Sequence, residues 1–267
     1  MSDYLLASDA EKDRLRLQAR VWEPEAESLF DTIGIGTGWS CADLGCGAMG
    51  VLGPLSRRVG PAGKVYGVDL DEGYLAAGRE YLDAQELRNV ELVRADVTAT
   101  GLPHGTFDLV HERFLMPYVP PEALLAEMLG LAKPGGLLVL QEPDHHSWSF
   151  HPESAKWFRF VEVLEKTFGL RGDINVGRRT FQLLRGAGLA DVRLRAAVLA
   201  LRPGHPYMRM PLTALPALRG PALQNGIATE AELDDLAAEV ERLAADAETY
   251  QITFTVTQVW GRKPSGP

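Results

Sequence analysis

The sequence predicts a doubly wound α/β protein, whose mostly parallel sheet is covered by helices on both faces. Apolar strand segments alternate with helical segments as far as about residue 146, which is the pattern of such a sheet. A glycine-rich loop follows the first strand, where parallel sheets of this kind bind ligands. With 267 residues, of which 46% are hydrophobic, the chain can bury the core that this fold requires.

The first half of the chain supplies five strand segments in turn. A polar segment with spaced apolar positions precedes them and predicts one or two leading helices over 9–33. We expect the strands at 40–47, 63–71, 89–97, 106–114 and 134–144. Helical spacing follows the second and fourth of them, at 71–87 and 120–133. Because crossovers between parallel strands are right-handed, the loops after the strands meet at one edge of the sheet.

The regular alternation of strands and helices ends after residue 146. An aromatic-rich helix, a loop and a helix ending at Gly186–Gly188 lead to a strand over 190–201. The Pro- and Met-rich segment 202–226 predicts a lid or an insertion. Thr229 is placed to cap a helix, with Glu232 as the partner in a capping box. Alternating apolar residues over 249–261 predict a last strand.

Composition and charge narrow the classes of partner. The formal net charge is -9, which disfavours binding to a phosphate backbone, so we expect no nucleic-acid partner. No apolar stretch is long enough to span a membrane and the first residues form no apolar leader, so we expect a cytoplasmic protein without membrane contact. Cys41 and Cys46 are interpreted as buried thiols. The sequence leaves homo-oligomerisation open.

The glycine loop fits two classes of adenosine-containing ligand. Gly45-Cys46-Gly47-Ala48-Met49-Gly50 matches the G-x-G-x-x-G pattern of a dinucleotide-binding turn. Asp69 ends the second strand, where an acidic residue can hold a ribose diol in either class. Asp43 places a carboxylate directly before the turn, which suits a cationic ligand better than phosphates. Asp96, after the third strand, can accept a hydrogen bond from an adenine amino group.

A series of motifs then makes the resemblance specific. In order and spacing, "ADLGCGAMG", "YGVDLD", "RADVTATGLPHGTFDLVHERF" and "LAKPGGLLVLQEPD" resemble the motifs of class I S-adenosylmethionine-dependent methyltransferases. Within that superfamily the chain is similar to the small-molecule branch, which includes ubiquinone/menaquinone-type and natural-product enzymes. One departure is Met49, which stands where the family usually has a third glycine, here displaced to Gly50.

The resemblance implies a Rossmann-like, seven-stranded sheet whose reversed last strand lies beside 190–201. It also implies methyl transfer from S-adenosylmethionine to an O, N or C atom of a small molecule, in secondary metabolism. We expect a helical N-terminal cap at 1–36 and a cofactor-binding core at 37–146. An aromatic-rich insertion with lid helices and the last two strands, at 147–267, would complete the same domain.

The resemblance also assigns the cofactor-binding residues, all of which follow strands except one in the leading helix. Those expected along the methionine part are Gln18, Asp43, Gly45, Cys46, Gly47 and, through its backbone, His111. Those expected at the ribose and adenine are Asp69, Leu70, Asp96 and Val97.

Catalysis of this displacement depends mainly on alignment of the acceptor with the methyl group, and a general base is needed only for an acceptor that is protonated at neutral pH. The candidate bases are His111, His145 and His146. For "QEPDHHSW" two other interpretations stay open: a metal site formed by Asp144 and the two histidines, or hydrogen bonding within the loop. We adopt no metal. For Glu112 and Arg113 an internal salt bridge is the favoured interpretation.

The acceptor should be a hydrophobic or aromatic small molecule, because two aromatic-rich segments follow strands of the same sheet. The side chains that could enclose it are Trp148, Phe150, Trp157, Phe158, Phe160, Tyr207, Met208 and Met210. For the helix that carries Trp157 and Phe160, a core position is favoured over a pocket. Two alternative functions remain: a cofactor-binding protein without methyl transfer, with a cyclase or regulatory role, and an NAD-dependent enzyme.

Overall fold

The computed structural model describes residues 9–265 and divides them into two compact units. Unit 1 comprises residues up to Glu142 together with Arg179–Arg195 and the chain from Thr257. Unit 2 comprises Pro143–Arg178 and Ala196–Val256. Residues 1–8 of the expected N-terminal cap lie outside the described part of the chain.

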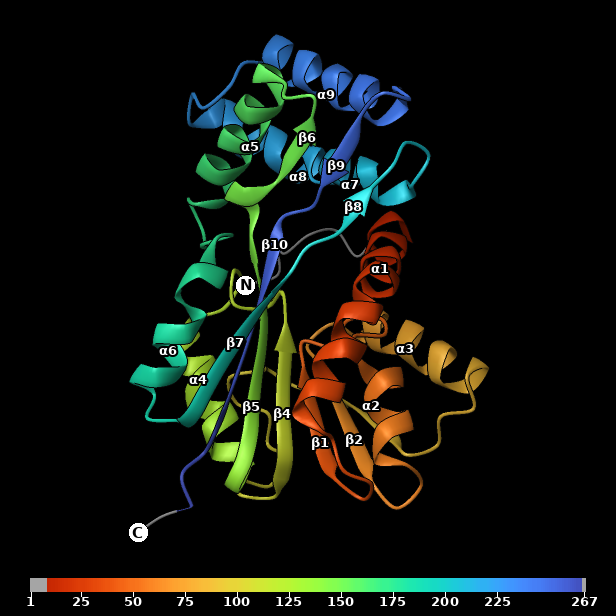
Figure 1. Ribbon diagram of the computed structural model, residues 1–267, viewed down its shortest axis with the longest axis vertical. Helices are drawn as coiled ribbons and strands as arrows, with labels where there is room; N and C mark the ends of the chain where they lie inside the picture. The colour runs from red at the N-terminus through yellow and green to blue at the C-terminus, as the bar shows by residue number, and fades with distance from the viewer. Residues whose placement is uncertain (1–8, 266–267) are drawn as a thin grey trace. The chain divides into compact units, whose positions relative to one another are not determined.

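Unit 1 contains the seven-stranded sheet that the sequence predicts. Its strands have the order β3-β2-β1-β4-β5-β10-β7, and Figure 1 shows β5, β4, β1 and β2 side by side. Neighbours from β3 to β5 pair in parallel, and one strand of the sheet is antiparallel, as expected. The strands are β1 Ser40–Leu44, β2 Lys64–Asp69, β3 Val90–Arg94, β4 Phe107–Arg113, β5 Ala132–Asp144, β7 Ala190–Ala197 and β10 Thr255–Arg262.

Helices and apolar strand residues build the core of unit 1. The helices are α1 Asp9–Ile33, α2 Leu52–Val59, α3 Glu72–Ala84, α4 Pro121–Leu131 and α6 Thr180–Gly186. The leading segment is thus a single helix, although it contains Pro24. Asp71 caps α3 by accepting a hydrogen bond from Tyr74 N at 2.9 Å. Because β1 is buried along almost its whole length, the loop after it starts from a fixed point.

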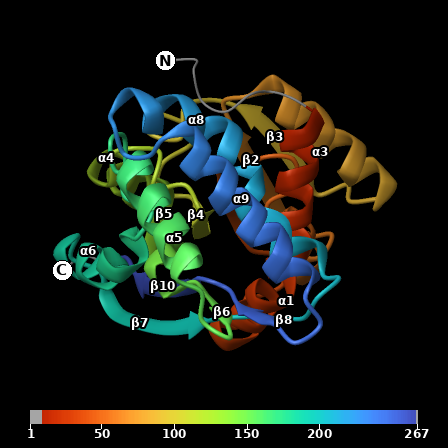
Figure 2. The same ribbon diagram turned by 90° about the horizontal axis from the view of Figure 1, so that it is seen from above.

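Unit 2 combines a small antiparallel sheet with helices. The strands, in the order β6-β9-β8, are β6 Ser149–His151, β9 Tyr250–Ile252 and β8 Ala200–Leu201. The helices are α5 Ala155–Phe168, α7 Met210–Thr213, α8 Leu215–Gln224 and α9 Glu230–Ala245, and Figure 2 shows α5, α8 and α9 side by side. Thr229 caps α9 as predicted, by accepting from Glu232 N, whereas the Glu232 carboxylate binds Arg159 instead of closing the capping box.

Two predicted strands are each divided in the structure. The segment 249–261 forms β9 and then β10, which belong to different sheets. The segment 190–201 divides in the same way, into β7 and β8. Thr253 N donates to Leu199 O at 2.9 Å, and Leu199 N donates to Thr253 Oγ1 at 2.9 Å. These bonds join the two points of division and satisfy backbone groups that a continuous ladder would have satisfied.

The Pro- and Met-rich segment is mostly helical. It forms a short 3-10 helix, Pro206–Arg209, followed by α7 and α8. Pro206, Pro211 and Pro216 each lie in a first turn, where the missing N–H of proline costs no hydrogen bond.

Most of the aromatic residues that we considered for the acceptor are core residues of unit 2. Trp157 and Phe160 are 1% and 2% exposed, which confirms the core position that the helical spacing favoured. Trp148, Phe150, Tyr207 and Met208 are also buried, and their expected place around the acceptor stays a prediction. Their rings fill the interior: the Trp148 and Trp157 ring centroids lie 5.2 Å apart in an edge-to-face arrangement. Phe158 is exposed and Met210 is half-buried.

Candidate active site

The loop after β1 can be built only with glycine at its turning points. Gly45, Gly47 and Gly50 have φ angles of +70°, +54° and +44°, a region that disfavours side chains. A Cβ at Gly45 would lie 2.9 Å from Leu115 Cδ1, and one at Gly50 would collide with the Asp43 carboxylate. Gly50 therefore supplies the third glycine position of the turn, although Met49 stands at the usual place.

A pocket opens beside this loop, within unit 1. Five of the predicted cofactor residues line it together: Gln18, Asp43, Gly45, Cys46 and Gly47. The other lining residues were not predicted: Leu15, Ala19, Ala48, Met49, Gly50, Arg113 and Phe114. Leu15 and Ala19 lie on the same helix as Gln18, at spacings that place residues on one helix face, which is a signal that the sequence did contain.

Asp43 is buried beneath the pocket and bound from two sides. The residue is only 2% exposed. Oδ2 accepts from Val51 N at 3.1 Å, and Oδ1 lies 2.7 Å from His111 Nδ1. Arg113 Nη2 donates to Gly50 O at 3.2 Å and so helps to hold the end of the turn. The carboxylate is thus fixed at the base of the loop.

Asp69 ties the glycine loop to the end of β2. Its Oδ2 accepts from Gly47 N at 2.8 Å, and its Oδ1 accepts from Asp71 N at 3.0 Å. Burial raises the pKa of Asp69, while these backbone hydrogen bonds act in the opposite direction. The next side chain, Leu70, is 58% exposed, which leaves an apolar surface available beside the carboxylate.

Asp96 and Val97 lie in the loop after β3, as predicted, but beyond the residues that line the pocket. Asp96 is exposed, and its Oδ1 accepts from both Thr98 N and Thr98 Oγ1, at 2.8 and 2.7 Å. The bond from the Thr98 hydroxyl is the main reason that the pKa of Asp96 is lowered. Val97 is 7% exposed and anchors the loop.

The structure corrects both expectations for His111. The strand β4 continues to Arg113, so His111 lies inside the ladder between β1 and β5, and its backbone is not free for a cofactor. Its side chain is fully buried, with Nδ1 at Asp43 and Nε2 2.7 Å from Gln141 Nε2, so it cannot take a proton from an acceptor. Burial lowers the pKa of His111. The strand ends at Arg113, and the next residue, Phe114, has a φ angle of +59° and lines the pocket.

His145 and His146 lie in unit 2 and have different surroundings. His145 is half-buried, with its ring 4.4 Å from that of Phe254, and its Nδ1 donates to Ile174 O at 2.8 Å. Burial lowers the pKa of His145 to about 4, so the ring is neutral at pH 7, with its proton on Nδ1 and a lone pair on Nε2. His146 is exposed, and its Nδ1 lies 3.1 Å from Glu165 Oε1.

The residues considered for a metal site each bind a different partner. Asp144 Oδ2 pairs with Arg178 Nε at 2.9 Å, and the two histidines bind elsewhere. Over residues 9–265, no group of three or more His, Cys, Asp or Glu side chains is arranged to hold a metal ion.

Two glutamates form a buried carboxyl pair at the ends of β4 and β5. Glu112 and Glu142 are both fully buried, and burial together with the neighbouring carboxyl group raises the pKa of Glu112. Glu142 Oε1 accepts from Leu115 N at 2.9 Å and from Met116 N at 2.8 Å, so it holds the loop after β4. The neighbouring carboxyl group that acts on Glu112 is Glu142, and the internal salt bridge expected for Glu112 and Arg113 stays a prediction.

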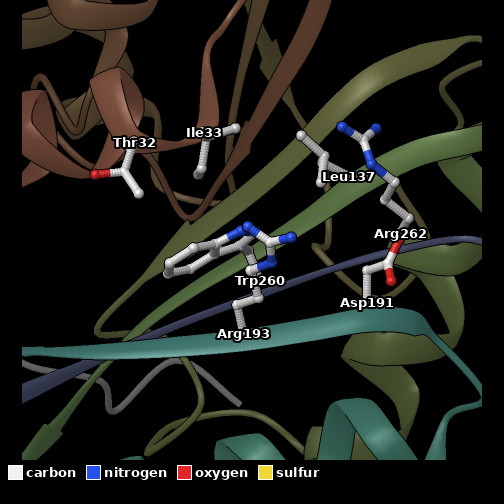
Figure 3. Close-up of a pocket in the computed structure, with 7 residues that line it drawn as sticks. All are labelled: Thr32, Ile33, Leu137, Asp191, Arg193, Trp260 and Arg262. Carbon is white, nitrogen blue, oxygen red and sulfur yellow. The ribbon is translucent and has the colours of Figure 1, made fainter.

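A second pocket of unit 1 lies around Trp260 (Figure 3). It is lined by Thr32, Ile33, Leu137, Asp191, Arg193, Trp260 and Arg262. It shares no residue with the glycine-loop pocket, and none of the predicted site residues lines it. Arg262 is engaged, since its Nη1 donates to Gly135 O at 3.0 Å. The candidate active site is therefore the pocket beside the glycine loop.

Comparison with known proteins agrees with the fold and the loop. The family described as a methyltransferase domain matches residues 41–136. A demethylmenaquinone methyltransferase of Staphylococcus aureus (strain Newman) is 32% identical over 197 residues, which are 67% of this chain and 78% of that protein. One from Geobacillus stearothermophilus is 29% identical over 182 residues, or 63% of this chain and 78% of that protein.

A solved structure shares the fold at lower identity. The geranyl diphosphate C-methyltransferase of Streptomyces coelicolor A3(2), in complex with Mg2+, geranyl-S-thiolodiphosphate and S-adenosyl-L-homocysteine, has a TM-score of 0.55 and 17% identity, covering 91% of this chain and 77% of that one. The chain belongs to the class I S-adenosylmethionine-dependent methyltransferases, of the small-molecule type. It is an enzyme, and its cofactor is S-adenosylmethionine, which sets aside the NAD-dependent alternative.

The residues around the glycine loop fit this cofactor. A Cβ at Gly47 would meet only Leu15 Cδ1, at 3.8 Å, so the backbone at this point of the turn borders open space where a ligand can approach. The carboxylates of Asp43 and Asp69 bind the two ends of the same loop, and negative groups suit a ligand with cationic and hydroxyl groups.

No helix of residues 9–265 is long and apolar enough to cross a membrane.

Proposed function

We propose that the enzyme methylates an O, N or C atom of a hydrophobic or aromatic small molecule, in secondary metabolism. The observation that carries this proposal is the similarity to demethylmenaquinone methyltransferases, which extends over 78% of their length. The shared fold with a geranyl diphosphate C-methyltransferase is consistent with an apolar acceptor. The net charge of -9 argues against a nucleic-acid acceptor.

The cofactor residues are assigned by their places around the loop. Asp43, Gly45, Cys46 and Gly47 would line the methionine part, with Gln18 of α1 at its carboxylate end. Asp69 would bind the ribose hydroxyls through lone pairs that its bonds to Gly47 and Asp71 leave free. At the adenine, Leu70 would cover one face, and Asp96 and Val97 would meet the edge.

The bound cofactor supplies a methyl group on a positively charged sulfur. The protein's contribution is to hold the reactants in line and to exclude water, and alignment alone can contribute about 7 to 11 kcal/mol. A base is required only for a hydroxyl or protonated amine acceptor. We propose His145 for that role, because its Nδ1 donates to Ile174 O, which fixes the ring and leaves Nε2 as the unprotonated nitrogen.

The direct test combines a binding and a transfer experiment. Isothermal titration should show that S-adenosylhomocysteine binds the wild-type protein. Incubation with methyl-labelled S-adenosylmethionine and a panel of quinols, phenols and prenylated acceptors should give a labelled organic-soluble product. Label found only in RNA or protein would contradict the proposed acceptor class. Binding without a product from any acceptor would instead support a role in which the cofactor is bound but its methyl group is not transferred.

His145→Ala should lower kcat at least about tenfold for a hydroxyl acceptor, because general bases contribute about 10²–10⁴-fold. The affinity for S-adenosylhomocysteine should stay within about twofold, since His145 lies outside the residues that line the glycine-loop pocket. His146→Ala is the matched control, because His146 is exposed and pairs with Glu165. Equal turnover of the two variants in a steady-state assay would remove His145 from catalysis.

A further inference from the structure

Four polar side chains form a continuous row across the buried part of the large sheet. They are Asp43 on β1, His111 on β4, Gln141 on β5 and Gln258 on β10, and these are successive strands of the sheet. Their exposed fractions are 2%, 0%, 1% and 0%, respectively. Buried polar groups destabilise a fold unless they are hydrogen-bonded, so a row of four requires an explanation.

The row has a single direction. Gln258 Nε2 donates to Gln141 Oε1 at 2.7 Å, and Gln141 Nε2 donates to His111 Nε2 at 2.7 Å. His111 must then carry its proton on Nδ1, which donates to Asp43 Oδ1 at 2.7 Å. Within the row, these three bonds are therefore all donated toward the carboxylate at the base of the glycine loop. The lowered pKa of His111 agrees with a neutral imidazole in this position.

The far end of the row reaches the helix that forms one wall of the pocket. Gln258 Nε2 also lies 3.2 Å from Glu25 O of α1, to which it donates. The same helix contributes Leu15, Gln18 and Ala19 to the pocket. Trp22 of α1 also meets Phe114 of the β4 loop, with ring centroids 6.1 Å apart.

We propose that His111, Gln141 and Gln258 are positioning residues for the cofactor, which fix the Asp43 carboxylate under the glycine loop and couple it to α1. None of the three touches the reacting atoms. The proposal rests on the proposed cofactor site at that loop. Hydrogen bonds in a buried row strengthen one another, so loss of a distant member is expected to loosen the bond that holds Asp43.

The test uses Gln258, the member of the row farthest from the pocket along the strands. Gln258→Met keeps the length of the side chain and removes both donor bonds. The Kd for S-adenosylhomocysteine, measured by titration calorimetry, should rise at least about fivefold, and the KM for S-adenosylmethionine should rise while kcat at saturation changes little. Val259→Ala is the matched control: it shortens a buried neighbour on the same strand and should lower Tm without changing Kd.

A double-mutant cycle separates positioning from general destabilisation. In an Asp43→Ala background, Gln258→Met should have no further effect on Kd, because the carboxylate that the row positions is gone. Unchanged affinity of Gln258→Met, or additive effects in the cycle, would overturn the proposal. Gln141→Met provides the same test if Gln258→Met does not fold. If the wild-type protein binds no S-adenosylhomocysteine, the cofactor site itself is overturned. If the wild type and the variants all bind it with the same affinity, only the positioning role of the row is overturned.

Discussion

Asp69→Ala is expected to weaken the binding of S-adenosylhomocysteine about 100-fold. A hydrogen bond to a charged group contributes about 1.5 to 3 kcal/mol, and the Asp69 carboxylate would accept such bonds from two partners. It would bind the ribose, and it holds Gly47 N at 2.8 Å, which is part of the loop that lines the pocket. Loss of both amounts to about 3 kcal/mol, or two powers of ten in Kd. Titration calorimetry at fixed pH and salt measures the change directly.

Asp71→Ala provides the matched control for this experiment. Asp71 follows Asp69 by two residues and caps α3 through Tyr74 N, so its loss should lower Tm by removing a helix cap. It accepts no hydrogen bond from the glycine loop in the structure, and Kd should therefore stay within about threefold of wild type. If Asp69→Ala binds as tightly as Asp71→Ala, the ribose lies elsewhere.

The sequence was sufficient to predict the strands of unit 1 and the loop residues at their ends. Apolar strands that alternate with helices predicted a parallel sheet, and the resemblance to methyltransferases implied its seven strands. Asp43, Gly45 and Gly47, which follow or end the first strand, come together around a pocket as expected. The surroundings of the last residues of β4 could not be predicted in the same way. The predicted strand at 106–114 already contained Glu112 and Arg113, but their polarity gave no sign that Glu112 is fully buried. His111 was expected to meet the cofactor at the open edge of the sheet, and it is instead a member of a buried row.

The division of the last strand depends on a distant partner. The apolar alternation of 249–261 is the same in β9 and β10, although the two belong to different sheets. Thr253 lies between them because it pairs with Leu199, 54 residues away in the sequence. Aromatic residues were ambiguous for a similar reason: Trp148 and Tyr207 have the chemistry of a ligand pocket and of a core alike, and only the packing of unit 2 distinguishes the two.

Glu142→Leu should lower the free energy of unfolding by about 2 to 5 kcal/mol. Glu142 Oε1 is the acceptor for Leu115 N and Met116 N, and a buried donor left without a partner costs about 1 to 3 kcal/mol. Leucine keeps the apolar volume but accepts neither bond. Glu142→Gln keeps an acceptor oxygen for both amides and should retain most of the stability. Urea denaturation at pH 7 measures both variants, and equal losses would show that the loop is held by other contacts.

The neighbouring Glu112→Gln variant tests whether the pair holds a proton in the native state. Burial, with Glu142 beside it, raises the pKa of Glu112, so between the unfolded and the folded pKa the native protein binds more protons than the unfolded chain. The contribution of Glu112 to stability is fully present below the pKa that this residue has in the unfolded chain. It is lost as the pH rises through the pKa that Glu112 has in the folded protein. Wild-type stability should therefore fall from pH 5 to pH 8 more steeply than that of Glu112→Gln, in which the side chain is neutral throughout. Parallel curves for the two proteins would mean that Glu112 is ionised in the folded state, and that the carboxylate of Glu142 holds the β4 loop without a shared proton.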